Sequence, residues 1–284
     1  MKKGLILEGG AMRGLFTAGV IDVMMENGIV YDGLVGVSAG AAFGCNYKSG
    51  QIGRTLRYNK KYCTDYRYCS VRSLIFTGDM YGAEFCYRKI PHELDLFDNE
   101  AYAENPMEFH LVCTDVLTGK AVYRKMEDLQ GENVDWIRAS ASMPLAARIV
   151  EVGGMKLLDG GVADSIPLKY FEKLGYNKNV VVLTQPEGYV KSPNKAMPIL
   201  RHVYRKYPAL LETISDRHNV YNETTAYISQ LEAQGSLFVI RPPEDLPVGH
   251  VTHKPELLQK VYDIGRKAME TRLSELKEYL SSEN

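Results

Sequence analysis

The hydrophobic pattern at the start of the chain predicts a strand, a glycine loop and a buried helix, followed by a second strand and a small-residue helix. Leu5 to Leu7 is an uninterrupted apolar run, typical of a strand covered on both faces of a parallel sheet. Residues 15–27 are apolar around most of the helical circumference, and Gly28 follows as a stop signal. Residues 34–37 predict the second strand. A strand–helix–strand unit of this kind has a right-handed crossover and predicts an α/β fold.

The rest of the chain alternates short apolar runs with longer helical segments. Strands are predicted over residues 109–116, 121–123, 148–152, 156–158, 180–183 and 237–240. Helices are predicted over residues 52–63, 134–142, 168–174, 199–234 (with breaks) and 255–280. Residues 185–198 are expected to form a long exposed loop.

Composition places the chain among ordinary soluble proteins and excludes several partners. Its 284 residues are 45% hydrophobic and 24% charged, which fits one large or two small globular domains. With 34 basic and 35 acidic residues, no nucleic-acid partner is expected. Five cysteines without C-x-x-C spacing and six histidines in no ligand pattern predict free thiols and no metal site. No signal peptide or membrane-spanning run is recognised, so a cytoplasmic protein is expected.

Residues Gly36-Val37-Ser38-Ala39-Gly40 fit the pattern G-x-S-x-G of a nucleophile elbow. In such an elbow a sharp strand-to-helix turn lifts the serine oxygen out of the sheet, and the two glycines are small because the backbone passes close to the strand and the helix. The following helix points its amino end at the serine. The same pattern also occurs in plain tight turns. Here an apolar strand precedes it and a small-residue helix follows, which favours a nucleophile at Ser38.

A glycine-rich loop connects the first strand to its helix and consists of Gly9, Gly10, Ala11, Met12, Arg13 and Gly14. As a dinucleotide fingerprint it is imperfect, because the middle glycine position holds Ala11 and no acidic residue ends the second strand. A P-loop is excluded because no Gly-Lys-Ser/Thr follows. An oxyanion hole fits best, because backbone N–H groups at a helix N-terminus attract a developing negative oxygen. Loops that follow adjacent parallel strands lie side by side, which places this loop next to Ser38.

A general base is also needed, and the residues alone leave two interpretations open. None of the six histidines stands in a recognisable motif. Asp159-Gly160-Gly161 follows an apolar strand and places a carboxylate on a tight glycine turn. Asp159 is therefore a candidate base, although Asp-Gly is also common in ordinary β-turns.

Taken in order, residues 8–14, 36–40 and 159–161 resemble the three motif blocks of the patatin-like phospholipase family, and residues 139–144 also fit. The chain is most similar to a bacterial cytoplasmic branch of that family with a C-terminal extension. The resemblance implies a three-layer α/β/α fold with a mainly parallel central sheet, plus C-terminal helices. It divides the chain into a motif-bearing part (4–171), the remainder of the same core (172–245) and a helical extension (246–284). An ordinary α/β-hydrolase fold is disfavoured, because only one βα unit precedes Ser38.

The resemblance also implies roles for the candidate residues. Ser38 would be the nucleophile and Asp159 the base of a Ser–Asp dyad, with the glycine loop as oxyanion hole and no cofactor. The sequence departs from the family at two places. Ala11 stands where a third glycine is common, which is compatible with the loop if its φ is negative. Ser165 stands where asparagine is common, which removes a supporting hydrogen bond.

These roles predict a serine-dependent hydrolase of lipid or other acyl esters that works through an acyl-enzyme. A carboxylate is a weak base toward serine, so the site must be desolvated to make Asp159 more basic. An acyltransferase and a non-catalytic lipid-binding scaffold remain the alternatives. The oligomeric state is not readable from the sequence.

Residues 51–73 combine basic and tyrosine side chains with a single acid, Asp65. Such a stretch could contact anionic lipid headgroups, which would place the protein peripherally at the inner membrane face. Stacking on RNA and a plain solvated helix face are the alternatives. Its basic residues are Arg54, Arg57, Lys60, Lys61, Arg67 and Arg72, and its tyrosines are Tyr58, Tyr62, Tyr66 and Tyr68.

Overall fold

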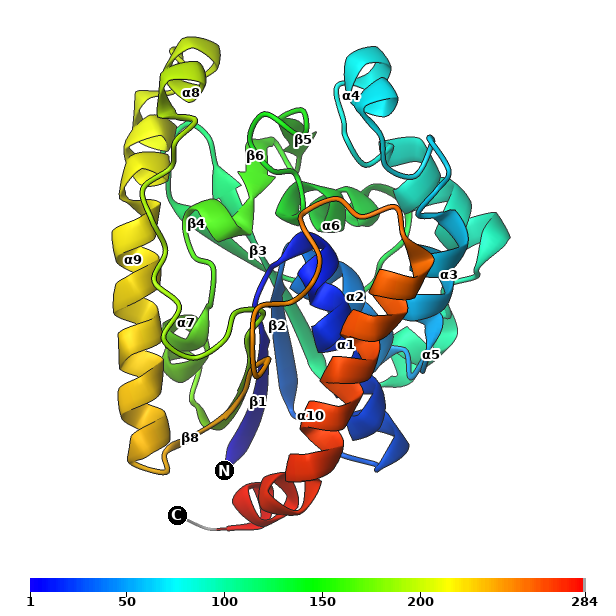
Figure 1. The fold of residues 1–284 in the computed structure, drawn as a ribbon, viewed down its shortest axis with the longest axis vertical. Helices are drawn as coiled ribbons and strands as arrows, with labels where there is room; N and C mark the ends of the chain where they lie inside the picture. Colours follow the sequence, from blue (N-terminus) through cyan, green and yellow to red (C-terminus); the bar gives the residue numbers. More distant parts are fainter. Residues whose placement is uncertain (283–284) are drawn as a thin grey trace.

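The computed structural model describes residues 1–282 and builds them around one eight-stranded sheet (Figure 1). The strand order is β5-β6-β3-β2-β1-β7-β8, with β4 paired to β3. Strands β3, β2, β1, β7 and β8 run parallel, whereas β4, β5 and β6 pair antiparallel. All eight lie where the hydrophobic pattern predicts strands: β1 (Lys2–Leu7), β2 (Gly33–Val37), β3 (Glu108–Asp115), β4 (Ala121–Lys125), β5 (Val150–Val152), β6 (Met155–Asp159), β7 (Tyr176–Val182) and β8 (Leu237–Ile240).

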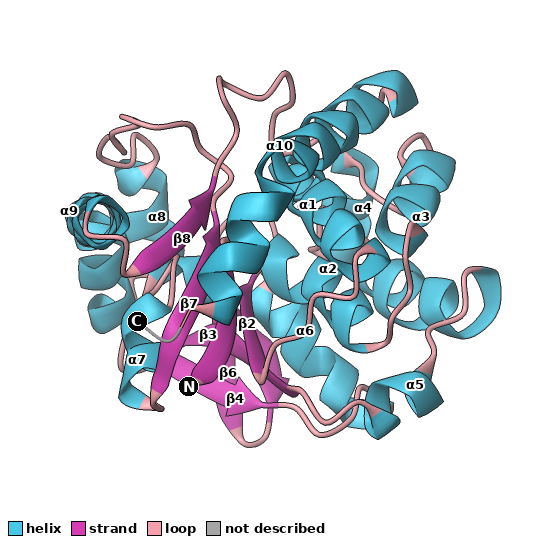
Figure 2. Cartoon of the chain, turned by 90° about the horizontal axis from the view of Figure 1, so that it is seen from below, coloured by secondary structure: helices cyan, strands magenta, loops and turns pink. Residues whose placement is uncertain are grey.

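Helices cover both faces of this sheet, which confirms the predicted three-layer architecture with C-terminal helices (Figure 2). One face carries α1 (Gly14–Glu26), α2 (Ala39–Lys48), α3 (Arg54–Tyr62), α6 (Val134–Ser140) and α10 (Pro255–Ser281). The other face carries α7 (Leu168–Lys173) and α9 (Pro208–Ala233), and α8 (Met197–Val203) contacts α9. None of the described helices is both long and apolar enough to cross a membrane.

Strand β1 shows why its residues are apolar without interruption. Leu5 and Leu7 belong to the core beneath α1, α2 and α10, whereas Ile6 belongs to the core beneath α7 and α9. Successive side chains of a strand point to opposite faces, so a central strand between two helical layers needs apolar residues at every position.

The C-terminal helix α10 is packed into the helical layer rather than appended to it. The Tyr262 hydroxyl donates to the Asp22 carboxylate of α1 over 2.7 Å, and Arg266 makes two hydrogen bonds to Glu26. Parallel strands β7 and β8 add residues 176–182 and 237–240 to the same sheet.

Between residues 71 and 104 the structure contains elements that the hydrophobic pattern did not predict. They are α4 (Val71–Thr77), a π-helix over Phe85–Leu94 that contains Pro91, and α5 (Asn99–Glu104). The pattern failed here because these elements are short or irregular, and a π-helix follows neither the 3.6-residue nor the two-residue period.

The structure corrects the prediction that residues 51–73 present one basic, tyrosine-rich surface. Arg54 is only 4% exposed, and its guanidinium hydrogen-bonds to Asn46 and to the backbone oxygen of Asp95. α3 packs against α1 and α10, and this packing explains why so much of the stretch is buried. The tyrosines that lie in the core are Tyr58, Tyr62 and Tyr68; the side chains that remain exposed are Arg57, Lys61, Tyr66, Arg67 and Arg72.

Candidate active site

Ser38 occupies a sharp turn between β2 and α2. Its backbone has φ 55° and ψ −121°, a conformation that L-residues rarely adopt. The turn leaves no room for larger neighbours: a Cβ on Gly36 would lie 2.4 Å from the Gly40 carbonyl oxygen, and a Cβ on Gly40 would lie 2.4 Å from the Leu7 oxygen. The two glycines of the G-x-S-x-G pattern therefore permit the strand and the helix to meet at Ser38.

Ser140, at the end of α6, fixes the backbone of this turn. The Ser38 N–H donates to Ser140 Oγ over 3.0 Å, and the Ser140 hydroxyl donates to the Val112 carbonyl of β3 over 2.7 Å. Ser140 is fully buried. The sequence motif over residues 139–144 includes this serine, but sequence reasoning assigned it no role.

Asp159 ends β6 and lies next to Ser38. Its Oδ1 accepts a hydrogen bond from the Gly161 N–H over 2.7 Å, and the Ser38 side chain lies close enough to the carboxylate to favour its ionised form. Burial raises the pKa of Asp159 above its ordinary value. The Ser38 hydroxyl, the Gly161 N–H and the Arg217 guanidinium oppose that rise by favouring the ionised form. The arrangement is a desolvated carboxylate in contact with a serine hydroxyl.

The turn after Asp159 is held by side chains that replace the expected asparagine contact. The Ser165 hydroxyl donates to the Gly161 carbonyl over 2.8 Å, and Arg217 Nε donates to the same oxygen. Serine at position 165 thus still supports the loop, although through a carbonyl rather than through Asp159.

The glycine loop packs directly against Ser38. A Cβ on Gly9 would lie 2.9 Å from the Ser38 Cβ, so the loop and the turn are in contact. Ala11 has a φ of +47°, which contradicts the condition that its φ be negative. An alanine in this left-handed region costs about 1–2 kcal/mol. The loop therefore keeps the glycine-like backbone and carries strain at Ala11.

Hydrogen bonds within the loop reduce the number of N–H groups that can face a ligand. The Arg13 N–H donates to the Gly10 carbonyl over 3.0 Å, and the Gly14 N–H donates to the carbonyls of Ala11 and Met12. Of the six candidates, this leaves the N–H groups of residues 9–12 as the ones able to face Ser38.

Glu8 anchors the start of the loop. One carboxylate oxygen accepts from the Thr184 N–H and hydroxyl at 2.5 and 3.1 Å, and the other accepts from the Tyr221 hydroxyl at 2.8 Å. These bonds tie the loop to the end of β7 and to α9. Sequence reasoning identified Glu8 only as the first residue of a motif block.

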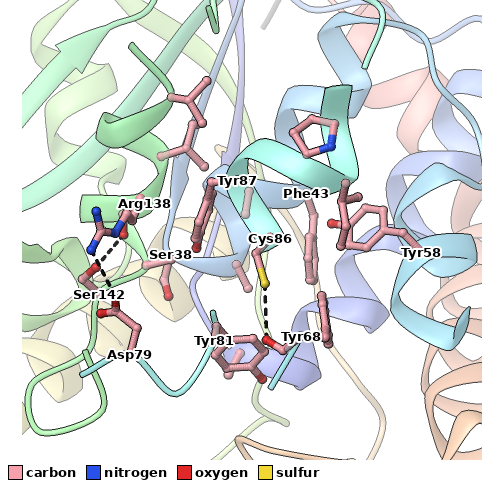
Figure 3. A pocket seen from close by; sticks show the side chains of 18 of the residues that line it. Ser38, Phe43, Tyr58, Tyr68, Asp79, Tyr81, Cys86, Tyr87, Arg138 and Ser142 are labelled. Atoms are coloured by element: carbon pink, nitrogen blue, oxygen red, sulfur yellow. Dashed lines mark hydrogen bonds and ion pairs between the residues drawn. The ribbon is translucent and has the colours of Figure 1, made fainter. Parts of the chain in front are cut away.

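An apolar chamber of about 310 Å³ opens from Ser38 between α2, α6 and the π-helix (Figure 3). Aromatic and aliphatic side chains line most of it, among them Phe43, Tyr58, Tyr68, Tyr87, Ile90 and Ile137. The polar exceptions include Asp79, which is paired with Arg138 at 3.0 Å. No local sequence motif predicted this chamber, because part of its wall comes from residues 71–104, where the hydrophobic pattern did not predict the elements.

A second chamber of about 250 Å³ lies on the other side of Ser38, and polar and apolar groups share its lining. Its lining includes the basic side chains Arg13, Lys191, Arg217 and His250, together with Glu8 and Asp159. We call it the basic chamber. The two chambers share Ala11, Ser38, Met143 and His250, so Ser38 lies where they meet.

Several of these residues come from the C-terminal third of the chain, where sequence reasoning found no candidate. Arg217 and Tyr221 belong to α9, and His250 lies on the strap between β8 and α10 that crosses above the site (Figure 1). Tyr81 holds this strap by donating to the His250 carbonyl over 2.8 Å.

Comparison with known families assigns most of these residues to two family models. Residues 5–172 match the patatin-like phospholipase model, and residues 207–281 match a domain of unknown function, DUF6363. The second model therefore covers α9, β8 and the whole of α10.

Individual relatives are distant. The uncharacterized protein YjjU of Escherichia coli is 25% identical over 280 residues, covering 92% of this chain and 74% of YjjU. The lysophospholipase nte1 of Aspergillus niger is 27% identical over 179 residues, covering 61% of this chain. The chain spans only 11% of that fungal protein. The crystal structure of VipD from Legionella pneumophila aligns with a TM-score of 0.49 at 12% identity, covering 96% of this chain and 67% of VipD.

The family model matches more than half of the chain and includes both Ser38 and Asp159. The chain belongs to the patatin-like phospholipase family.

Proposed function

We propose that this protein is a serine-dependent lipid acyl hydrolase that uses Ser38 as nucleophile and Asp159 as general base. The observation that carries the proposal is the proximity of the Ser38 side chain to the buried Asp159 carboxylate, beside the point where the two chambers meet. An ester with one acyl chain in the apolar chamber would bring its carbonyl carbon to this point.

In the first half of the reaction, Ser38 Oγ attacks the ester carbonyl while its proton passes to Asp159. The carbonyl oxygen becomes negative and accepts hydrogen bonds from the backbone N–H groups of residues 9–12. The tetrahedral intermediate then breaks the ester C–O bond, and protonated Asp159 gives its proton to the leaving alcohol oxygen. In the second half, water loses a proton to Asp159 and attacks the acyl-enzyme. Collapse releases the acid and returns the proton to Ser38.

Two features of the site make a carboxylate adequate for this work. Burial raises the pKa of Asp159, so its ionised form takes a proton more readily than an exposed carboxylate does. The N-terminus of α2 begins at Ser38, where its partial positive charge stabilises negative charge on Oγ. General-base action contributes roughly 10²–10⁴ in rate, and one oxyanion donor about 3 kcal/mol.

The chambers favour a substrate with a single acyl chain. Only one of the two chambers that open from Ser38 is apolar, and a second acyl chain in the basic chamber would lie against charged groups. The name lysophospholipase of the fungal relative agrees with a monoacyl substrate. We therefore place the substrate among monoacyl lipid esters.

Covalent labelling with a fluorophosphonate probe, followed by intact mass measurement, tests the proposal. The unmodified protein should gain one adduct, and the Ser38→Ala variant should gain none. Ser192→Ala, at an exposed position outside both chambers, is the matched control and should label fully. Release of fatty acid from a monoacyl ester in water should depend on Ser38 in the same way. Labelling of Ser38→Ala, or ester hydrolysis without Ser38, would overturn the assignment.

We further propose that the end of the molecule around α4 contacts anionic membranes. Val71, Ile75 and Phe76 are 63%, 73% and 75% exposed, and Arg72 lies between them on the same helix. α4 protrudes at the end of the molecule where the parallel strands terminate (Figure 1). Apolar side chains beside an arginine suit the interface of an anionic bilayer.

Flotation with liposomes tests this contact. The protein should float with vesicles that contain anionic lipid, and Phe76→Asp should reduce the bound fraction. Val190→Asp, at another apolar position that is 71% exposed but lies on the loop after β7, is the matched control. Equal loss in both variants, or no binding by the unmodified protein, would contradict the proposal.

A further inference from the structure

We infer that the basic chamber binds the phosphate of an anionic lipid headgroup, and that the substrates are monoacyl phospholipids without a compensating positive charge. The inference rests on the proposed function, because it assigns the headgroup side of the same site. The acyl chain would occupy the apolar chamber, the ester would lie at Ser38, and the phosphate would lie between Arg13, Lys191 and Arg217.

The three cations reach the chamber from separate parts of the chain. Arg13 precedes α1, Lys191 lies on the loop after β7, and Arg217 lies on α9. Within residues 1–282, none of them has a carboxylate within ion-pair distance. The Arg13 Nε is buried and has no hydrogen-bond partner. Arg217 Nε donates to the Gly161 carbonyl and the Lys191 ammonium lies over the Tyr221 ring, but neither contact supplies a counter-charge, which an anionic ligand would provide.

The two acidic residues of the chamber already have their hydrogen bonds elsewhere. Glu8 accepts from Thr184 and Tyr221, and Asp159 accepts from Gly161. The three cationic side chains outnumber the two acidic ones, so an anionic ligand would balance the charge of the chamber.

Lys191 is held in position by its backbone rather than by an ion pair. The Asn222 side chain of α9 accepts from the Lys191 N–H over 2.8 Å and donates to the Lys191 carbonyl over 3.0 Å. The ammonium group lies 4.2 Å from the centre of the Tyr221 ring. Burial and the neighbouring Arg217 and Arg13 lower the pKa of Lys191 to about 8. The repulsion among these cations is the quantity that a bound phosphate would relieve.

This charge distribution distinguishes among headgroups. A glycerol phosphodiester brings one negative charge and no positive one. A choline headgroup brings a quaternary ammonium, which proteins bind with aromatic cages or acidic side chains. In the basic chamber that ammonium would be repelled by Arg13, Lys191 and Arg217. This repulsion would offset much of the binding free energy that the phosphate of a zwitterionic lipid contributes.

The test compares kcat/KM for three monoacyl esters with the same acyl chain, measured below their micelle-forming concentrations. They are lysophosphatidylglycerol (anionic), lysophosphatidylcholine (zwitterionic) and monoacylglycerol (neutral). We expect the anionic ester to be hydrolysed at least tenfold more efficiently than the other two. Lys191→Gln should reduce this preference several-fold and should do so mainly through KM. Lys195→Gln, an exposed lysine on the same loop outside both chambers, should keep the preference.

Binding without turnover provides the second measurement. Glycerol 3-phosphate should compete with the fluorophosphonate probe for the unmodified protein more strongly than glycerophosphocholine, and Lys191→Gln should weaken the competition. Equal kcat/KM for the three esters, or an unchanged preference in Lys191→Gln, would overturn the headgroup assignment while Ser38-dependent hydrolysis still supported the proposed function. Absence of both hydrolysis and labelling would count against the proposed function itself.

Discussion

The two chambers that meet at Ser38 are built in opposite ways. The apolar chamber comes mainly from residues 39–147, a nearly continuous stretch that lies between β2 and β5 in the sequence. The basic chamber is assembled from the loop after β1, the loop after β7, helix α9 and the strap before α10. The apolar chamber thus lies mostly within the part of the chain that matches the patatin-like model. The C-terminal region contributes much of the basic chamber. This separation means that changes in chain-length preference and in headgroup preference should be independent of each other.

The largest effect is expected at Asp159, which lines the basic chamber beside Ser38. Asp159→Asn should reduce kcat by roughly 10²–10⁴ for every ester, whatever its chain or headgroup, because the proton acceptor is lost. Burial raises the pKa of this carboxyl, so its ionised form destabilises the folded state at neutral pH. The unfolding temperature of Asp159→Asn at pH 7 should therefore equal or exceed that of the unmodified protein.

Kinetics and thermal unfolding of the same preparation measure both effects. Asp216→Asn, at an exposed position on α9, is the matched control and should change neither quantity. An active Asp159→Asn variant, or a loss confined to one headgroup class, would contradict the role of Asp159 as the base for every ester.

The next effect concerns the apolar chamber alone. Ala42 of α2 lines this chamber but not the basic one, so Ala42→Phe should place a ring in the space for the acyl chain. Displacing two or more methylenes at about 0.8 kcal/mol each reduces binding of a long chain by more than roughly tenfold. A butyryl ester should be affected far less, and headgroup preference should remain.

Ala103→Leu, at an exposed position of α5, controls for a general effect of added volume. The measurement is kcat/KM for esters from four to sixteen carbons. A uniform loss across that series would mean that Ala42→Phe disturbs the Ser38 turn rather than the acyl chamber.

Sequence reasoning was strongest where function depends on local backbone geometry. The glycines around Ser38 are needed because strand and helix approach within contact distance there, and that requirement leaves a short pattern in the sequence. The end of β6 at Asp159 leaves a second short pattern, Asp-Gly-Gly. Antiparallel pairing of β6 with β3 brings Asp159 close to Ser38. The condition that Ala11 have a negative φ is not met, because the loop retains its left-handed turn without the glycine.

The basic chamber could not be found in this way. Lys191 and Arg217 stand in no pattern, and they reach Ser38 only because β7 lies beside β1 and α9 covers that face. The same limitation explains the error over residues 51–73. Arg54 and Tyr58 look like surface residues in an isolated helix, and their burial depends on segments that follow much later in the chain, such as Asp95 and α10.

A smaller effect is expected of pH on kcat/KM and on KM. It should differ between anionic and neutral substrates, because only the anionic ones depend on the cations of the basic chamber. For all substrates, kcat/KM should fall at acidic pH as Asp159 becomes protonated, at a pKa above its ordinary value. For anionic headgroups alone, KM should also rise above pH 8, because Lys191 has a pKa of about 8 and loses its charge there. Burial and the neighbouring cations Arg13, Arg217 and Lys191 lower the pKa of His250, which disfavours its charged form.

A phosphodiester substrate is suited to this measurement, because its own charge does not change between pH 7 and pH 9. The rise in KM should be several-fold between pH 7 and pH 9, since the protonated fraction of Lys191 falls from roughly nine-tenths to one-tenth. It should be absent for monoacylglycerol and absent in Lys191→Gln. A basic limb that persists in Lys191→Gln would assign the titration to another group.

The smallest predicted effect is on stability at the junction itself. Ser38 has a φ of 55°, and both Ser38→Ala and Ser38→Gly remove the hydroxyl. Alanine keeps the strain of the turn, whereas glycine relieves it, so the glycine variant should be more stable by about 1 kcal/mol despite the ordinary cost of glycine. Denaturant unfolding of the two variants side by side measures the difference. If alanine were the more stable, the turn would not be strained, and the rigidity that holds Ser38 between the two chambers would have to come from the Ser140 hydrogen bond alone.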